Sequence, residues 1–234
     1  MNAVFDAATQ LLSVPVFWAT LTIAAFLTGQ RVYLILGKNA LLPPILTGLA
    51  LVVLCLEVSG TSHQTYMQGG EYLHIFLGPV VVMLAIPLMQ FLHTMKRYWL
   101  RIMLALTLGS ATTVATSVVL VHWLIDDDLI ARTIHTKSIT TPVAVTISEQ
   151  FGGSSALASV FVIITGILGA VMAPAILKWV KWDSPQAVGL TLGVCAHAVG
   201  TGRALELGQE QAAYAAMAMT LTATLHALLL PWII

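Results

Sequence analysis

The sequence predicts an all-α polytopic membrane protein with about seven spanning helices and one re-entrant or broken helix. Hydrophobic residues make up 58% of the 234 residues and charged residues only 9%, and the mean hydropathy is +0.91. An ordinary soluble domain is far less apolar. The apolar residues also form long blocks, each close to the ~20 residues that a helix needs to cross the hydrocarbon layer. We therefore expect a single transmembrane domain over residues 1–234.

The spanning helices are predicted directly from these apolar blocks. They lie at residues 13–29, 40–58, 73–93, 102–125, 156–178, 185–205 and 211–232. Tryptophans stand near the ends of several blocks, where an amphipathic ring favours the headgroup region: Trp99, Trp123, Trp179, Trp182 and Trp232. The first block follows no basic region and no cleavage site, so we expect a retained helix and not a signal peptide.

The loop charges predict an orientation, because Lys and Arg are retained on the cytoplasmic side. With the N-terminus outside, the following residues fall inside: Arg31, Lys38, Lys96, Arg97, Arg101, Lys178 and Lys181. The residues that do not are Arg132, Lys137 and Arg203. This count holds only if residues 135–153 enter and leave on one side, and it then places the C-terminus inside.

The segment from His135 to Gly153, HTKSITTPVAVTISEQFGG, is too short and too polar for a span that faces lipid. Thr141 can cap a helix, and Pro142 suits the first helical position. Gly152 and Gly153 then allow the chain to turn back. A helix from Pro142 would be only about 15 Å long, so we interpret the segment as re-entrant. The alternative is a loop followed by an amphipathic helix on the membrane surface.

The start of this half-helix is a candidate anion site. The unpaired N–H groups of Val143 and Ala144, together with the helix dipole, favour a negative ligand. Thr140 and Thr141 add hydroxyl groups, and Lys137 stands just upstream. Irregular backbone at membrane depth occurs only where protein or a water-filled cavity surrounds it, so a buried polar site is expected here.

A second polar stretch, GLTLGVCAHAVGTGRALELG, covers residues 189–208. Gly189, Gly193 and His197 recur at four-residue spacing and share one face, on which another helix can pack closely. The GTGR sequence, with Gly200 and Thr201, predicts an interrupted helix. An arginine inside a membrane segment is costly unless it is paired or faces water. Arg203 is therefore a candidate for function, or it extends to the interface and pairs with Glu206.

A third stretch has Gly78, Pro79 and Pro87 inside one apolar run, which predicts a kinked or broken helix. The PVVV sequence at 79–82 and the PVAV sequence at 142–145 are offset by the same interval that lays 41–60 over 104–123. Such an offset suggests inverted repeats with interrupted helices, as in many secondary transporters. Few other positions match, so the sequence does not separate this repeat from chance.

No other chemistry is indicated. The sequence has no phosphate-binding loop, no nucleophile elbow, no HExxH and no CxxC pair, so we expect no metal, no cofactor and no enzymatic activity. The formal net charge is zero and no basic cluster is large, so a nucleic-acid partner is not expected. Cys55 and Cys195 both lie in apolar runs, where they are expected to be small buried residues.

Three blocks in this sequence resemble the LrgB/CidB family of membrane proteins, bacterial relatives of the C-terminal half of the plastid glycolate/glycerate translocator. KSITTPVAVTISEQFGG, LGPVVVMLAIPL and HAVGTGRALE are similar to the family's KSVTTPIA, LGPATVALAIPL and HAIGTARA. The resemblance covers about residues 66–232. Thr136 replaces the usual proline, and Gly202 stands where alanine is common.

The resemblance implies a multi-pass protein of the bacterial inner membrane and two functions from different classes. Some members are described as holin/antiholin-like regulators of murein hydrolase activity and lysis, whereas others carry small monocarboxylates such as glycolate, glycerate or pyruvate. A smaller LrgA/CidA-like membrane protein is the implied partner, and an oligomer is expected.

Of the two functions, the residues favour transport of a small carboxylate. We expect Thr140, Thr141 and the backbone of Val143 and Ala144 to bind the carboxylate. Arg203 would neutralise it. His197 and Glu149 are candidates for proton coupling, because a membrane histidine or glutamate exchanges protons near neutral pH when its surroundings shift its affinity.

Overall fold

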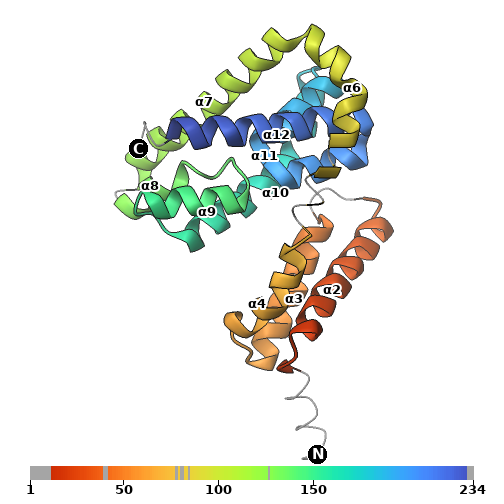
Figure 1. The fold of residues 1–234 in the computed structure, drawn as a ribbon, viewed down its shortest axis with the longest axis vertical. Helices are drawn as coiled ribbons and strands as arrows, with labels where there is room; N and C mark the ends of the chain where they lie inside the picture. The colour runs from red at the N-terminus through yellow and green to blue at the C-terminus, as the bar shows by residue number, and fades with distance from the viewer. Residues whose placement is uncertain are drawn as a thin grey trace, which may run out of the picture. The chain divides into compact units, whose positions relative to one another are not determined.

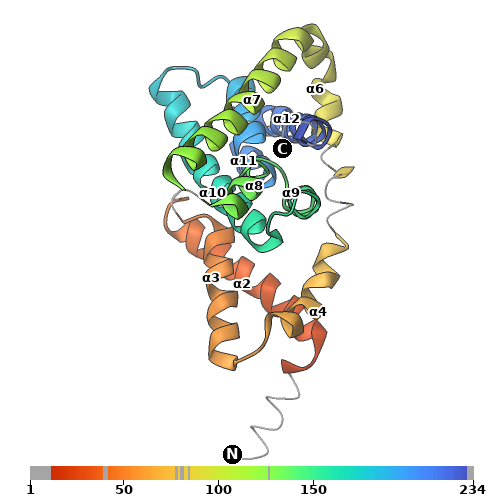
Figure 2. The ribbon, with the colours of Figure 1, turned by 90° about the vertical axis from the view of Figure 1, so that its left-hand side faces the viewer.

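The computed structural model describes residues 12–38, 42–76, 79, 82–83, 85–125 and 127–230. The regular secondary structure in these ranges is entirely helical, which confirms the all-α prediction. The chain divides into two compact units, Met1–Met83 and Leu84–Ile234. The helices of each unit are labelled in Figures 1 and 2.

The first unit contains α2 (Pro15–Ile35), α3 (Pro44–Ser59) and α4 (His63–His74). Proline in the first turn starts both α2 and α3, where its missing N–H group has no helical partner to lose. Gly60, at φ 63°, ends α3 in a left-handed conformation. The hydroxyl of Ser62 caps α4 by accepting from the N–H of Thr65 at 3.2 Å.

The second unit holds the remaining described helices. They are α6 (Ala85–Arg97), α7 (Trp99–Leu124), α8 (Asp128–Ile134), α9 (Thr141–Gln150), α10 (Ser155–Trp179), α11 (Pro185–Leu207) and α12 (Gln209–Leu229). Three of them, α7, α10 and α12, are long and apolar enough to cross a membrane. They match the predicted spans at 102–125, 156–178 and 211–232, so a multi-pass membrane protein is supported.

The other predicted spans have different outcomes. The span predicted at 13–29 corresponds to α2, which is not among the described helices that are long and apolar enough to cross a membrane. The span predicted at 40–58 corresponds to α3, a shorter apolar helix of 16 residues. The expected break at Gly78 and the PVVV copy of the proposed repeat lie outside the residues that are fully described. The span at 185–205 corresponds to α11, which is not continuous.

The glycine spacing predicted that another helix packs closely on this part of the chain, and the structure shows that this helix is α12. A methyl group at Gly189 would lie 2.5 Å from the carbonyl oxygen of Gln211, and one at Gly193 would lie 2.6 Å from Cβ of Ala218. Real Cβ atoms do not approach this closely, so only glycine lets the two backbones pack at this distance. The first half of α11 is therefore held firmly against α12.

Candidate functional site

The segment before α9 consists of the short helix α8 and a turn that is largely buried. Asp127 caps α8 by accepting from the N–H groups of Leu129 and Ile130 at 2.9 and 3.0 Å. The turn that follows is almost inaccessible: Thr136 is 0% exposed, Ser138 2% and Ile139 1%. A polar turn that is buried this completely fits a re-entrant segment better than a loop on the surface.

The helix α9 then leads back along α10. The buried side chains of Ala144 and Ile147 pack in one cluster with Ala158 and Val162 of α10. Gly152, at φ 73°, makes the turn between the two helices, as the sequence predicted. Figures 1 and 2 show α9 as a short helix beside α10.

The hydrogen bonds at the start of α9 correct one part of the prediction. The N–H of Ala144 donates to the carbonyl oxygen of Thr140 at 2.9 Å, so it is not free for a ligand. Thr140, and not Thr141, is the N-cap residue, and its hydroxyl makes no capping bond. The cap falls one residue earlier because Pro142 is accepted at the second helical position. Among the described residues, the N–H groups of Thr141 and Val143 have no partner.

The helix α11 is interrupted, but not at the predicted place. His197 adopts φ 42° and ψ −126°, which is not helical. Gly200 lies against the carbonyl oxygen of Leu192, eight residues earlier, whereas eight residues of continuous helix rise about 12 Å. The chain therefore bends back sharply at His197, and not within Gly200–Gly202.

The position of the break has a physical explanation. The ring of His197 is 2% exposed, and its Nε2–H donates to the carbonyl oxygen of Val162 at 3.0 Å. A methyl group at Gly166 would lie 2.8 Å from Cε1 of this ring, so the glycine makes room for it. Gly200 is needed for close approach to the first half of α11, and Gly202 meets open space. The tertiary bond to α10 thus fixes the break on a histidine.

Val162 of α10 links the start of α9 to the break in α11. The side chain of Val162 packs in one cluster with Ile139 and Ala144, at the start of α9, and its carbonyl accepts from His197. Val114 of α7 and Ala223 of α12 pack against the same cluster. Residues of α7, α10 and α12 therefore pack on the buried side of the beginning of α9.

Lys137 is the cation that the structure places beside this point. Its side chain is half-buried, and Nζ lies 3.5 Å from Oγ of Ser138. It stands three residues before Thr140, the N-cap residue of α9. A positive charge therefore stands a few residues before the two free N–H groups, and Lys137, Thr141 and Val143 are all half-buried.

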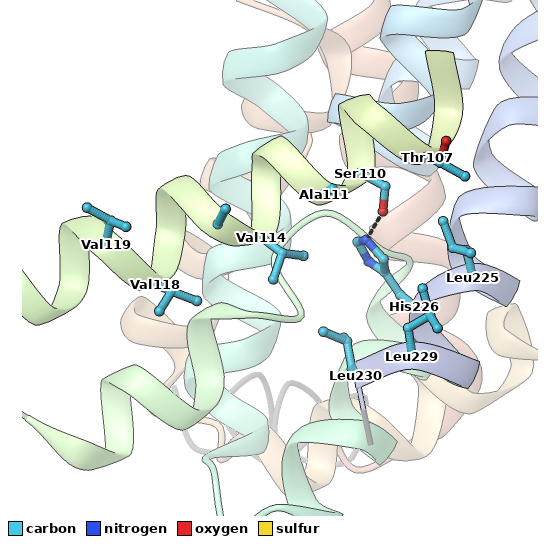
Figure 3. Close-up of a pocket in the computed structure, with 11 residues that line it drawn as sticks. Thr107, Ser110, Ala111, Val114, Val118, Val119, Leu225, His226, Leu229 and Leu230 are labelled. Carbon is cyan, nitrogen blue, oxygen red and sulfur yellow. Dashed lines mark hydrogen bonds between the residues drawn. The ribbon is translucent and has the colours of Figure 1, made fainter. Parts of the chain in front are cut away.

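The pair Ser110 and His226 lies next to this region and was not predicted. Oγ of Ser110 and Nε2 of His226 share a short hydrogen bond between α7 and α12 (Figure 3). Both side chains are 2% exposed. The pair lines a cavity of about 520 Å³ between the two helices, and the other lining side chains are mainly apolar. This pair could not be predicted from the sequence, because each residue is an isolated polar position in an apolar run.

The other predicted site residues are exposed or already hydrogen-bonded to other groups of the protein. Arg203 donates to Glu206 at 2.5 Å, which is the alternative that the sequence left open. Glu149 is exposed and accepts from the hydroxyl of Ser155 at 2.5 Å. Thr201 is buried, and its hydroxyl donates to the carbonyl of His197 at 2.9 Å. In the described ranges, no group of three or more His, Cys, Asp or Glu side chains could hold a metal ion.

Comparison with known proteins gives a consistent result. The profile of the LrgB-like family matches residues 22–234. An uncharacterized protein of Bacillus subtilis, YxaC, is 35% identical over 92% of this chain and 93% of its own length. The holin-like protein CidB of Staphylococcus epidermidis is 34% identical over 84% of this chain and 86% of its own. The antiholin-like protein LrgB of Bacillus subtilis is 28% identical over 93% of this chain and 94% of its own length. No solved structure matches significantly.

Proposed function

We propose that this chain, which belongs to the LrgB-like family, carries small monocarboxylates across the bacterial inner membrane. The substrates would be 2-hydroxy or 2-oxo acids such as glycolate, glycerate or pyruvate. One observation supports the proposal above the others: the start of α9 and the break in α11 meet at Val162, with Lys137 beside them.

The start of α9 suits an anion for two reasons. The free N–H groups of Thr141 and Val143 can donate to a carboxylate, and the helix adds a partial positive charge of about half an electron at this end. The helix has 10 residues and packs along α10, so its first turn is held in place. The hydroxyl groups of Thr140 and Thr141 lie at the same turn.

Lys137 makes the preference for an anion stronger. A charged side chain at membrane depth costs several kcal/mol unless it is paired or solvated. A bound carboxylate would pair with it, and a single nearby cation matches a singly charged ligand. Arg203 is already paired with Glu206, so we assign the neutralising role to Lys137 in preference to Arg203.

Broken helices at the centre of a bundle are the usual setting for a transported solute, since they free backbone groups without exposing them to lipid. We further propose a protein with its N-terminus outside and its C-terminus inside, acting as an oligomer with an LrgA/CidA-like membrane partner. Nothing in the arrangement calls for an enzymatic step.

Uptake of labelled glycolate into proteoliposomes tests the proposal. Lys137→Gln should lower kcat/KM at least about tenfold, which is about 1.4 kcal/mol, because it removes the charge beside the free N–H groups. Arg203→Gln should have a much smaller effect. Lys178→Gln, on the exposed last turn of α10, is the matched control. Equal uptake by wild type and Lys137→Gln, or uptake that does not saturate, would contradict the assignment.

The names of two relatives, holin-like and antiholin-like, favour a second candidate, in which the chain regulates lysis as part of a pore-forming assembly. This function predicts leakage of unrelated solutes, such as a trapped dye, without saturation. It also predicts little dependence on Lys137. Dye release and glycolate uptake measured on the same vesicles separate the two candidates.

A further inference from the structure

The helix α11 is too short on either side of its break to cross the membrane. His197 divides it into two halves of roughly 10–12 residues, each about 15–18 Å long, whereas the hydrocarbon layer is about 30 Å thick. Accordingly, α11 is not among the described helices that are long and apolar enough to span. The path of the chain between α10 and α12 therefore depends on how the two halves lie.

Both ends of α11 lie at the start of α12. Near the beginning of α11, a methyl group at Gly189 would lie 2.5 Å from the carbonyl oxygen of Gln211. Nε2 of Gln186, one turn earlier, donates to Oε1 of Glu210 at 2.5 Å. At the other end, Gly208 alone separates α11 from α12. The second half of α11 thus returns to the level at which the first half began.

The two halves of α11 are packed against each other along this return. Ala204 of the second half belongs to one buried cluster with Val188 of the first half, although a continuous helix would hold these residues about 24 Å apart. The same cluster contains Ala173, near the end of α10, and Ala215, near the start of α12. The end of α10, both halves of α11 and the start of α12 therefore lie together.

The spanning helices fix the direction of the chain on either side of α11. Tyr214, near the start of α12, packs in one cluster with Ile102, near the start of α7. Ser110 and His226, further along the two helices, are hydrogen-bonded, and Figure 3 shows both helices continuing in the same direction from this pair. Because α7 and α12 are parallel and span the membrane, they end on the same side of it. The helix α11 begins and ends on the other side.

We infer that α11 is a re-entrant hairpin, which enters from the cytoplasmic side, reaches Val162 at its tip and returns to the cytoplasmic side. The tip is His197, whose ring donates to the carbonyl oxygen of Val162. The segment before α9 enters from the opposite side, because it connects the end of α7 to the start of α10. The start of α9 also packs at Val162. Two interrupted segments from opposite sides thus approach one residue, an inverted arrangement of the kind found in secondary transporters.

The charges of the second unit favour this course and set its orientation, since Lys and Arg are retained on the cytoplasmic side. With α11 as a hairpin, the following residues are cytoplasmic: Lys96, Arg97, Arg101, Lys178, Lys181 and Arg203. The other Lys and Arg residues of this unit are Arg132 and Lys137. Counting α11 as a full span, as the orientation proposed above does, puts Arg203 outside and the C-terminus inside. The hairpin reverses both, so it revises that orientation and places the C-terminus outside.

The hairpin also gives each side of the membrane its own barrier. A solute bound near Val162 would be separated from the cytoplasm by α11 and from the outside by the segment before α9. This consequence rests on the function proposed above, whereas the course of α11 does not depend on any substrate.

Cysteine labelling in intact cells tests the course of α11. In a chain with Cys55 and Cys195 replaced by alanine, single cysteines replace Asp128 in α8, Asp183 between α10 and α11, or Gln209 at the start of α12, which are all exposed. A membrane-impermeant maleimide should label Asp128→Cys in intact cells. It should label Asp183→Cys and Gln209→Cys only after the membrane is permeabilised. Alkaline phosphatase fused to the C-terminus, which is active only outside the cytoplasm, should be active.

Labelling of Gln209→Cys together with Asp128→Cys in intact cells would overturn the hairpin, because α11 would then cross the membrane. An inactive phosphatase fusion would also contradict it. Labelling of Asp183→Cys and Gln209→Cys in intact cells, with Asp128→Cys protected, would overturn the cytoplasmic assignment. Elution profiles establish that each variant is folded, and the fusion decides the outcome if a cysteine variant is not. Neither readout measures flux, so a failure of glycolate uptake would reject the proposed function and leave the hairpin in place.

Discussion

The break in α11 can be tested by exchanging His197 for glycine and for alanine. A residue with a Cβ atom at φ 42° and ψ −126° occupies a region that is natural only for glycine. Holding such a residue there costs about 1–3 kcal/mol. Both variants lose the same ring contacts, namely the bond to the carbonyl of Val162 and the contact with Gly166. Their difference therefore isolates the backbone strain.

The two variants should differ in the direction opposite to helix propensity. In a continuous helix, alanine stabilises the fold by about 1 kcal/mol relative to glycine. In the broken helix, His197→Gly should be more stable than His197→Ala by about 1–3 kcal/mol. For a chain of this length, 1 kcal/mol shifts Tm by roughly 2–4 °C, so the glycine variant should melt about 2–12 °C higher.

Thermal unfolding in detergent micelles, followed by tryptophan fluorescence, measures this difference. Gly202→Ala is the control, because Gly202 is helical and meets open space. There, alanine should be as stable as glycine or more stable by up to about 1 kcal/mol. Should His197→Ala melt at or above His197→Gly, the helix is continuous at His197 and the site built on its interruption is wrong.

Two further stability predictions follow from contacts in the second unit. Gly193→Val should lower the free energy of unfolding by about 1–3 kcal/mol, because the new side chain would overlap with Ala218 of α12. Gly202→Val should lower it far less, since Gly202 meets open space, and the melting temperatures of the two variants test this difference. Ser110→Ala should lower the free energy of unfolding by about 1–3 kcal/mol, because it leaves Nε2 of His226 buried without a partner. Ser159→Ala removes a hydroxyl that bonds only to its own helix and should lower it by less than half of that amount. Equal losses of stability in the two variants would show that the bond between Ser110 and His226 contributes nothing specific.

The sequence predicted the features that depend on local chemistry. The apolar blocks at 102–125, 156–178 and 211–232 became α7, α10 and α12, since length and hydropathy decide whether a helix can span. The start of α9 was placed within one residue, because proline restricts which positions can begin a helix. The glycine spacing in α11 predicted that another helix packs closely on it, because glycines four residues apart leave one face of a helix without side chains.

The features that depend on tertiary contacts could not be predicted. The break in α11 fell on His197 because a carbonyl of α10, 35 residues away, accepts a hydrogen bond from its ring. Glycine was the natural expectation for a positive φ, yet Gly200 and Gly202 remain helical. Ser110 and His226 were missed because a single polar residue in an apolar run looks the same whether it bonds to its own helix or to a distant one.

Burial without a partner does not by itself define the site. The hydroxyl groups of Ser148 and Tyr214 in the second unit are buried and unpaired in the described structure. Ser148 lies beside Gly153 at the far end of α9, and Tyr214 packs with Met95 and Ile102 near the start of α12. A neutral unpaired hydroxyl can be satisfied by one water molecule, but a half-buried lysine near free N–H groups attracts an anion.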